Sequence, residues 1–113
     1  MGSNIFLHYD PPSDSWSTIS TGSSAFYFGY YTAAAVVDGK IIISRGYLGG
    51  AGQENIKVYD PVSNKWSYST AATSIWDGAA TAYRDKLYIF AGRSDPNRME
   101  VYSIKEDTTL TNL

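Results

Sequence analysis

Short apolar runs separated by turn residues recur along this chain. A small-apolar run, residues 33–37, leads through Asp38-Gly39 into a second run, residues 41–44. The same order returns as residues 79–83, Arg84-Asp85 and residues 86–91. Asp-Gly between two apolar runs is a strong signal for a tight β-hairpin. Because no segment shows the apolar period of a helix, the pattern predicts an all-β fold of short antiparallel strands.

A second phrase follows each of these hairpins and also occurs near the start of the chain. It is VYDPVSNKW at residues 58–66, HYDPPSDSW at 8–16 and, in worn form, VYSIKEDTT at 101–109. In the first two copies a Trp follows seven residues after the Tyr, whereas Thr109 takes the place of Trp in the third. Asp-Pro and the following Ser or Asn predict a turn between two further strands. The chain is therefore read as a repeat protein.

The complete unit is a small-apolar run, a tight turn, a hydrophobic run, Gly, a loop, Tyr and then Trp. This order resembles the kelch repeat, and a galactose-oxidase-like propeller is its close structural cousin. The resemblance implies four-stranded antiparallel blades of a β-propeller, of roughly 50 residues each. The chain departs from the family at the Gly-Gly doublet, where it has Arg45-Gly46 and Ala91-Gly92.

The repeats divide the chain into about two and a half blades, which makes it a partial propeller. We expect a single kelch-like repeat domain after a short expression remnant, with these limits: remnant 1–3, domain 4–113, half blade 4–20, first full blade 32–70 and second full blade 78–113. The repeat-defining positions are Tyr9, Trp16, Gly46, Tyr59, Trp66, Gly92 and Tyr102. His8 aligns with apolar Val58 and Val101, so we expect it to be half-buried.

A closed propeller needs about four to eight blades. The chain is therefore expected either to be part of a longer protein or to close the ring by self-assembly as a cyclic dimer or trimer. One route is strand addition, in which the N-terminal segment of one copy, with Trp16, completes the last blade of another, which has Thr109 instead.

Composition narrows the chemistry. Among 113 residues, 18% are charged, the net charge is −2 and no basic run occurs, so neither nucleic acid nor a membrane is an expected partner. The chain has no Cys and one His, which removes disulfides and most metal chemistry, and no cofactor is predicted. The cellular compartment is left open.

Function is expected on the face that carries the long loops, because long loops on a rigid scaffold commonly bind ligands. Its aromatic residues could stack on sugars, anchor a peptide or fill gaps between blades: Tyr27, Tyr30, Tyr31, Tyr47 and Trp76. Arg93 could pair with a partner's carboxylate or be a solvated loop charge. Glu54, Asp77 and Asp95 are the candidate carboxylates for glycoside hydrolysis, although nothing in the sequence fixes their spacing.

Two functions follow from these observations. The first is a non-catalytic, kelch-like module for protein–protein interaction, self-assembly or both. The alternative is an extracellular propeller that binds or processes carbohydrate. An aromatic pocket with two carboxylates would favour the alternative, and a flat mixed surface would favour the first.

Overall fold

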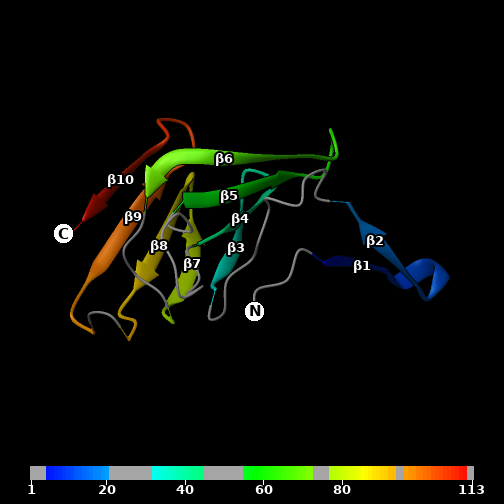
Figure 1. Cartoon of the computed structure of the whole chain (residues 1–113), viewed down its shortest axis with the longest axis horizontal. Helices are drawn as coiled ribbons and strands as arrows, with labels where there is room; N and C mark the ends of the chain where they lie inside the picture. Colours follow the sequence, from blue (N-terminus) through cyan, green and yellow to red (C-terminus); the bar gives the residue numbers. More distant parts are fainter. Residues whose placement is uncertain (1–4, 21–31, 45–54, 73–76, 94–95, 112–113) are drawn as a thin grey trace.

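Strands account for almost all the regular structure of the computed structural model, which describes residues 5–20, 32–44, 55–72, 77–93 and 96–111 (Figure 1). The one helical element in these ranges is a single 3-10 turn, η1 (Pro11–Ser13). Because Pro cannot donate a backbone hydrogen bond and has a fixed φ, the Pro11-Pro12 pair suits the start of such a turn. The expectation of an all-β fold is confirmed.

The strands form three antiparallel sheets. A two-stranded hairpin at the N-terminal end pairs β1 with β2, and two four-stranded sheets follow in the orders β3-β4-β5-β6 and β7-β8-β9-β10. The strands are β1 (Phe6–Asp10), β2 (Ser15–Ile19), β3 (Ala34–Val37), β4 (Lys40–Ile43), β5 (Asn55–Asp60), β6 (Lys65–Ala72), β7 (Ala79–Tyr83), β8 (Lys86–Phe90), β9 (Met99–Ser103) and β10 (Thr108–Thr111). Sequential pairing in groups of four is the strand order of propeller blades, as predicted.

The tight turn between β3 and β4 forms as its sequence predicts. Asp38 and Gly39 both have positive φ, 51° and 72°, which is the backbone of the hairpin turn that Asp-Gly favours. In the second sheet Arg84 takes the left-handed conformation at the corresponding place, with φ of 56°. Gly92 has φ of 109°, a conformation that favours glycine. Gly46 lies outside the described residues.

Each copy of the Tyr phrase folds in the same local way. In all three, the Tyr hydroxyl donates to the Oδ1 atom of an Asp or Asn five residues later, over 2.8–2.9 Å. That acceptor residue has a left-handed backbone each time, which Asp and Asn tolerate better than most residues. The pairs are Tyr9–Asp14, Tyr59–Asn64 and Tyr102–Asp107.

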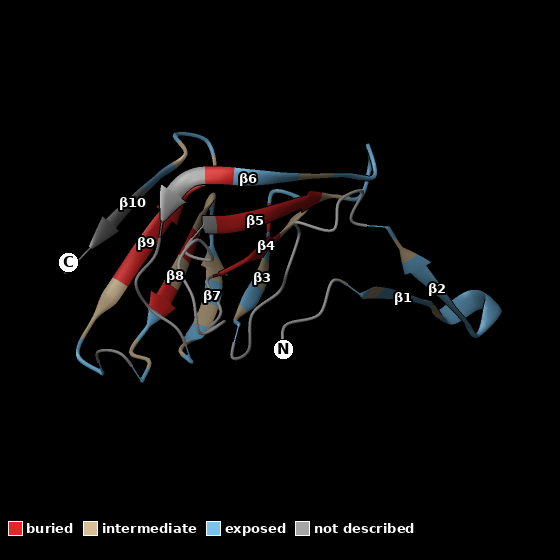
Figure 2. Cartoon of the chain, in the orientation of Figure 1, coloured by how far each residue is buried: buried red, intermediate tan, exposed pale blue. Residues whose placement is uncertain are grey.

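The core lies between the two four-stranded sheets (Figure 2). Since side chains alternate across a strand, each sheet presents one apolar face to the other. The buried cluster comprises Val37, Ile42, Ile56 and Val58 from the first sheet and Leu87, Ile89 and Tyr102 from the second. Each such side chain contributes about 1.5–3 kcal/mol by burial. The small Ala35, Ala80 and Ala82 also pack against this cluster, on the two innermost strands.

A polar contact joins the outer strands of the two sheets. Ser69 on β6 donates a hydrogen bond to the Asp107 carboxylate, which also accepts the Tyr102 hydroxyl. Asp107 precedes β10, whose Thr109 pairs with Tyr102 in the register. The last sheet therefore already has its outer strand, although the Trp typical of that position is replaced.

The hairpin β1–β2 extends to one side of the two large sheets (Figure 1). Phe6 connects it to the first sheet: its ring lies 5.8 Å from the Tyr59 ring and 5.0 Å from the Trp66 ring, edge-on to the latter. The expectation that His8 is half-buried is wrong. His8 is exposed because the hairpin meets the first sheet mainly through Phe6, so the rest of that side is uncovered.

Candidate functional site

Two of the candidate residues on the predicted loop face, Arg93 and Asp77, are among the described residues. Arg93 is exposed. The remaining predicted ligand contacts lie outside the described residues: Tyr27, Tyr30, Tyr31, Tyr47, Glu54, Trp76 and Asp95. Asp77 is exposed, and the other two candidate carboxylates, Glu54 and Asp95, are among those seven, so the carboxylate pair stays a prediction.

An aromatic face that sequence reasoning missed lies on the far side of the second four-stranded sheet. Tyr83, Tyr88 and Phe90 project from β7 and β8 on the side opposite the core, as the strand alternation and the cross-strand register require. The Tyr83 and Tyr88 rings are 6.5 Å apart and edge-on, and the Tyr88 and Phe90 rings are 6.5 Å apart and stacked. We call these three residues the aromatic face.

The first sheet shows what normally covers such a face. When the two repeats are aligned on their shared Lys, Lys40 and Lys86, Tyr83 and Tyr88 correspond to Val37 and Ile42. Both of those are buried against the second sheet, whereas Tyr83 is 60% exposed. Phe90 is 39% exposed and Tyr88 is half-buried, so the aromatic face is only partly covered. Its positions are those that pack against a neighbouring sheet in the first sheet.

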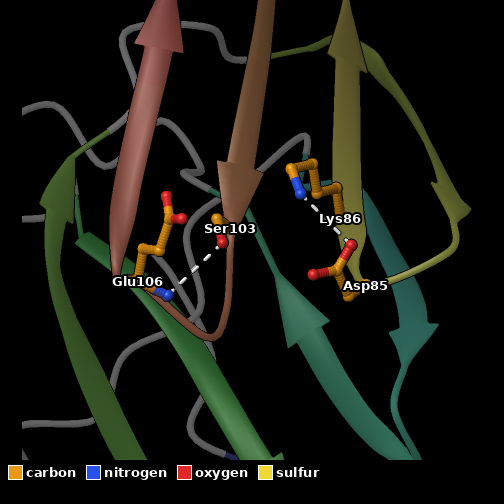
Figure 3. A network of polar contacts seen from close by, with 4 residues as sticks. All are labelled: Asp85, Lys86, Ser103 and Glu106. Atoms are coloured by element: carbon orange, nitrogen blue, oxygen red, sulfur yellow. Dashed lines mark hydrogen bonds and ion pairs between the residues drawn. The ribbon is translucent and has the colours of Figure 1, made fainter.

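Charged side chains border one end of the aromatic face. The Arg84 guanidinium lies over the Tyr83 ring, 5.5 Å from its centroid. Lys86 forms an ion pair with Asp85 over 3.2 Å, close to the turn in which the Glu106 N–H donates to the Ser103 hydroxyl (Figure 3). The Lys86 ammonium is the main reason that the pKa of Asp85 lies below its ordinary value. An apolar centre with a charged rim is the general arrangement of protein–protein interfaces.

The signal for this face was present in the sequence. Residues 79–83 and 86–90 alternate small or aliphatic positions with Thr, Tyr, Tyr and Phe, so one side of the hairpin is aromatic. Aligning that side with Val37 and Ile42 would have shown the aromatic residues at packing positions. The sequence analysis predicted the site in the loops instead, because binding residues are common in loops.

Two hollows flank the first sheet. The outer groove, of about 450 Å³, separates the outer strands of the two large sheets and is lined by Lys40, Lys65, Ser69, Tyr102 and Asp107 among others. Burial, with Asp107 adding to it, raises the pKa of Tyr102. The hairpin cleft, of about 510 Å³, lies between β1 and the first sheet and is more apolar, with Phe6, Tyr9, Ile41 and Tyr59 among its lining residues.

Across the described ranges, no helix is long and apolar enough to cross a membrane. Nor do three His, Asp or Glu side chains in those ranges gather closely enough to hold a metal ion.

The four-stranded sheets are blades of the β-propeller class, and comparison with known proteins identifies the family. The family description "Kelch motif" fits residues 29–70. A kelch domain-containing protein of Saccharolobus solfataricus is 33% identical over 93 residues, which cover 80% of this chain and 12% of that protein. An F-box/kelch-repeat protein of Arabidopsis thaliana is 30% identical over 89 residues, which cover 77% of this chain and 23% of that protein.

The chain therefore belongs to the kelch-repeat family, as its Tyr and Trp spacing indicated. Kelch repeats generally mediate protein–protein interaction. The chain spans 12% and 23% of the lengths of these two relatives.

Proposed function

We propose that this chain is a non-catalytic protein-interaction module that binds its partner on the aromatic face, and that a second copy of the chain can be that partner. The observation that carries the proposal is the contrast between Tyr83, 60% exposed, and its buried counterpart Val37. Large aromatic side chains that are exposed together typically mark an interaction surface.

The chemistry of the aromatic face suits a protein partner. Tyr and Phe rings bury a large area and lose little side-chain entropy, and Tyr keeps a hydroxyl that can bond at the edge of an interface. The face lies on two strands of a rigid four-stranded sheet, so the three rings are positioned before binding. Pre-organisation of this kind lowers the entropic cost of association.

Self-association is supported by a second exposed aromatic surface at the other end of the molecule. The Tyr9 and Trp16 rings on the hairpin lie 5.0 Å apart, tilted by 40°, and both residues are exposed. Two different surfaces that bind each other head to tail form a ring when the rotation closes, which favours a cyclic dimer or trimer. β10 already occupies the outer position of the last sheet, where a strand of another copy would have to add. Assembly through stacked blade faces is therefore favoured over strand addition.

Light scattering after size-exclusion chromatography tests this function. The wild-type chain should elute at a multiple of the mass of one chain, whereas Tyr83→Glu and a chain without residues 1–20 should elute as monomers. Val62→Glu is the matched control, because Val62 is an exposed apolar residue in the turn between β5 and β6 and belongs to neither aromatic surface. A monomeric wild type at high concentration, or an assembled Tyr83→Glu variant, would overturn self-association through the aromatic face.

A further inference from the structure

The outer groove has an apolar floor and a polar rim. Val58 of β5 and Ile104, which follows β9, both line it and both pack in or against the core cluster. Tyr102 is a lining residue as well and is buried, so it belongs to the floor. Lys65 and Ser67 of β6 are lining residues that are exposed. The groove volume of about 450 Å³ is in the range of sites for small ligands, about 300–1,000 Å³.

The strand register shows which side chains of the first sheet project towards the groove. Ser67 pairs with Val58, and paired residues project on the same side of a sheet. Val58 faces the second sheet, so Ser67 does too, as does Lys65 two residues earlier on the same strand. Lys40 pairs with Val37, another core residue that faces the second sheet. The two lysines and the Ser67 hydroxyl are therefore on one wall.

The ammonium groups on this wall are available to an anion. Within the described ranges, neither Lys40 nor Lys65 forms an ion pair. The repeat provides a comparison, because Lys86 is the counterpart of Lys40 and pairs with the preceding Asp85. Gly39 takes the place of that Asp before Lys40, so the chain supplies no such neighbour there.

The two carboxylates of the groove already accept hydrogen bonds from the chain itself. Asp60 accepts the backbone N–H of Val62 over 2.9 Å. Asp107 accepts the hydroxyl groups of Tyr102 and Ser69. These bonds tie both carboxylates to their own turns and strands, whereas the lysines face the open volume. The groove is therefore better suited to an anionic ligand than to a cationic one.

The groove also lies where this repeat has lost an aromatic ring. Thr109 pairs with Tyr102 as Trp66 pairs with Tyr59. A Trp at position 109 would project on the same side of the sheet as Tyr102, which is the side of the groove. Because the sequence has no Trp there, the ring of a ligand can lie over the apolar floor.

We infer that the outer groove binds a small aromatic carboxylate. The ring packs on Val58 and Ile104, and the carboxylate accepts charge-assisted hydrogen bonds from the Lys40 and Lys65 ammonium groups. The Ser67 hydroxyl donates a further hydrogen bond at the rim. None of these residues belongs to the aromatic face, so the inference does not depend on the proposed self-association.

Two probes with the same ring test the site on the full chain. N-acetyl-tryptophan has a carboxylate, whereas N-acetyl-tryptophanamide is neutral. In an NMR titration, the acid should shift the amide signals of Ser67 and Ile104 saturably and should bind at least about fivefold more tightly than the amide. That advantage should shrink between about 20 mM and about 500 mM salt, because salt screens the exposed charges.

Variants of the wall residues separate the charge from the ring. Lys40→Gln and Lys65→Gln should each weaken binding of the acid at least about threefold and leave the amide unchanged. Ser67→Glu should weaken the acid at least about tenfold, because it puts a like charge beside the carboxylate. Lys86→Gln and Ser17→Glu are matched controls at the same positions of other repeats, and neither residue lines the groove. Both controls should bind the acid as the wild type does.

A filling variant tests the space for the ring. Thr109→Trp should abolish binding of both probes, and the variants of exposed Lys65 and Ser67 keep the test valid if that Trp does not fit. The inference is overturned if the acid does not bind, if the acid and the amide bind equally well, or if both lysine variants bind the acid like the wild type. Binding of a peptide with an internal Trp-Glu sequence, without binding of the acid, would also overturn it.

Discussion

The hairpin β1–β2 and the outer strands β5–β6 carry the same aromatic pair in nearly the same geometry. The Tyr9 and Trp16 rings are 5.0 Å apart at 40°, and the Tyr59 and Trp66 rings are 4.8 Å apart at 36°. The exposure of the two pairs differs. Tyr9 is 39% exposed, whereas its counterpart Tyr59 is 5% exposed. Trp16 is 68% exposed, whereas its counterpart Trp66 is half-buried.

The difference separates two levels of structure. The Tyr hydrogen bond depends on the turn between two strands and forms in all three copies of the phrase. The Tyr–Trp pair forms in both copies that contain the Trp. Burial depends on what packs against the pair, which for Tyr59 and Trp66 includes Phe6. The same residues should therefore contribute very different amounts to stability in the two places.

The largest effect is expected from removing the Trp in each copy. Trp66→Ala should lower the free energy of unfolding by about 3 kcal/mol, near the lower end for buried aromatic residues because Trp66 is half-buried. Trp16→Ala should cost about 1 kcal/mol or less, the contribution of an exposed aromatic pair. Urea unfolding of both variants measures the difference. Equal losses would show that the hairpin is as well supported as the first sheet.

The next effect contrasts the hydrogen bonds of the two buried Tyr residues. Tyr102→Phe should cost about 2 kcal/mol, because its acceptor is the Asp107 carboxylate. Tyr59→Phe should cost about 1 kcal/mol, because its acceptor is the Asn64 side-chain amide. Thermal unfolding under identical conditions compares them. A larger loss for Tyr59→Phe would contradict the assignment of the stronger bond to the carboxylate.

The third effect restores the missing Trp. Thr109 pairs with Tyr102 as Trp66 pairs with Tyr59, and the outer groove lies beside Tyr102. Thr109→Trp should therefore raise the free energy of unfolding by about 0.5–2 kcal/mol, as cavity-filling changes commonly do. Denaturant midpoints of the variant and wild type measure the gain. A loss of stability would indicate that the groove cannot accept the ring.

Most of the fold could be predicted from the sequence because its signals are local. Apolar alternation, Asp38-Gly39 and the Tyr–Trp spacing each fix a strand or turn within about ten residues. The strand boundaries shift by one or two residues because ladder ends depend on the partner strand. The prediction that His8 is half-buried was wrong for a related reason, because its burial depends on a neighbouring sheet that the local sequence does not specify.

The candidate site was harder to predict. The alternation placed Tyr83, Tyr88 and Phe90 on one side of a hairpin, but which side faces the core depends on how two sheets pack. That packing is a long-range property, and in this chain it is decided by clusters such as Val37 with Leu87.

The smallest effect is a change in stability with pH, and it tests the Tyr102 site from another direction. Burial, with Asp107 adding to it, holds the folded pKa of Tyr102 above 10.0, so the unfolded chain loses this proton first as pH rises. Tyr102 therefore stabilises the fold fully below about pH 10, and this contribution is lost as pH rises through the folded pKa.

Lys57 has the opposite effect on the free energy of unfolding. Burial lowers its folded pKa below 10.5, so its deprotonation stabilises the fold as pH approaches that value. Since Lys57 is the same in both proteins, the difference in unfolding free energy between wild type and Tyr102→Phe isolates the Tyr102 contribution. That difference should be constant from pH 7 to 9 and shrink above pH 10. A constant difference up to pH 11 would show that Tyr102 titrates alike in the folded and unfolded chains.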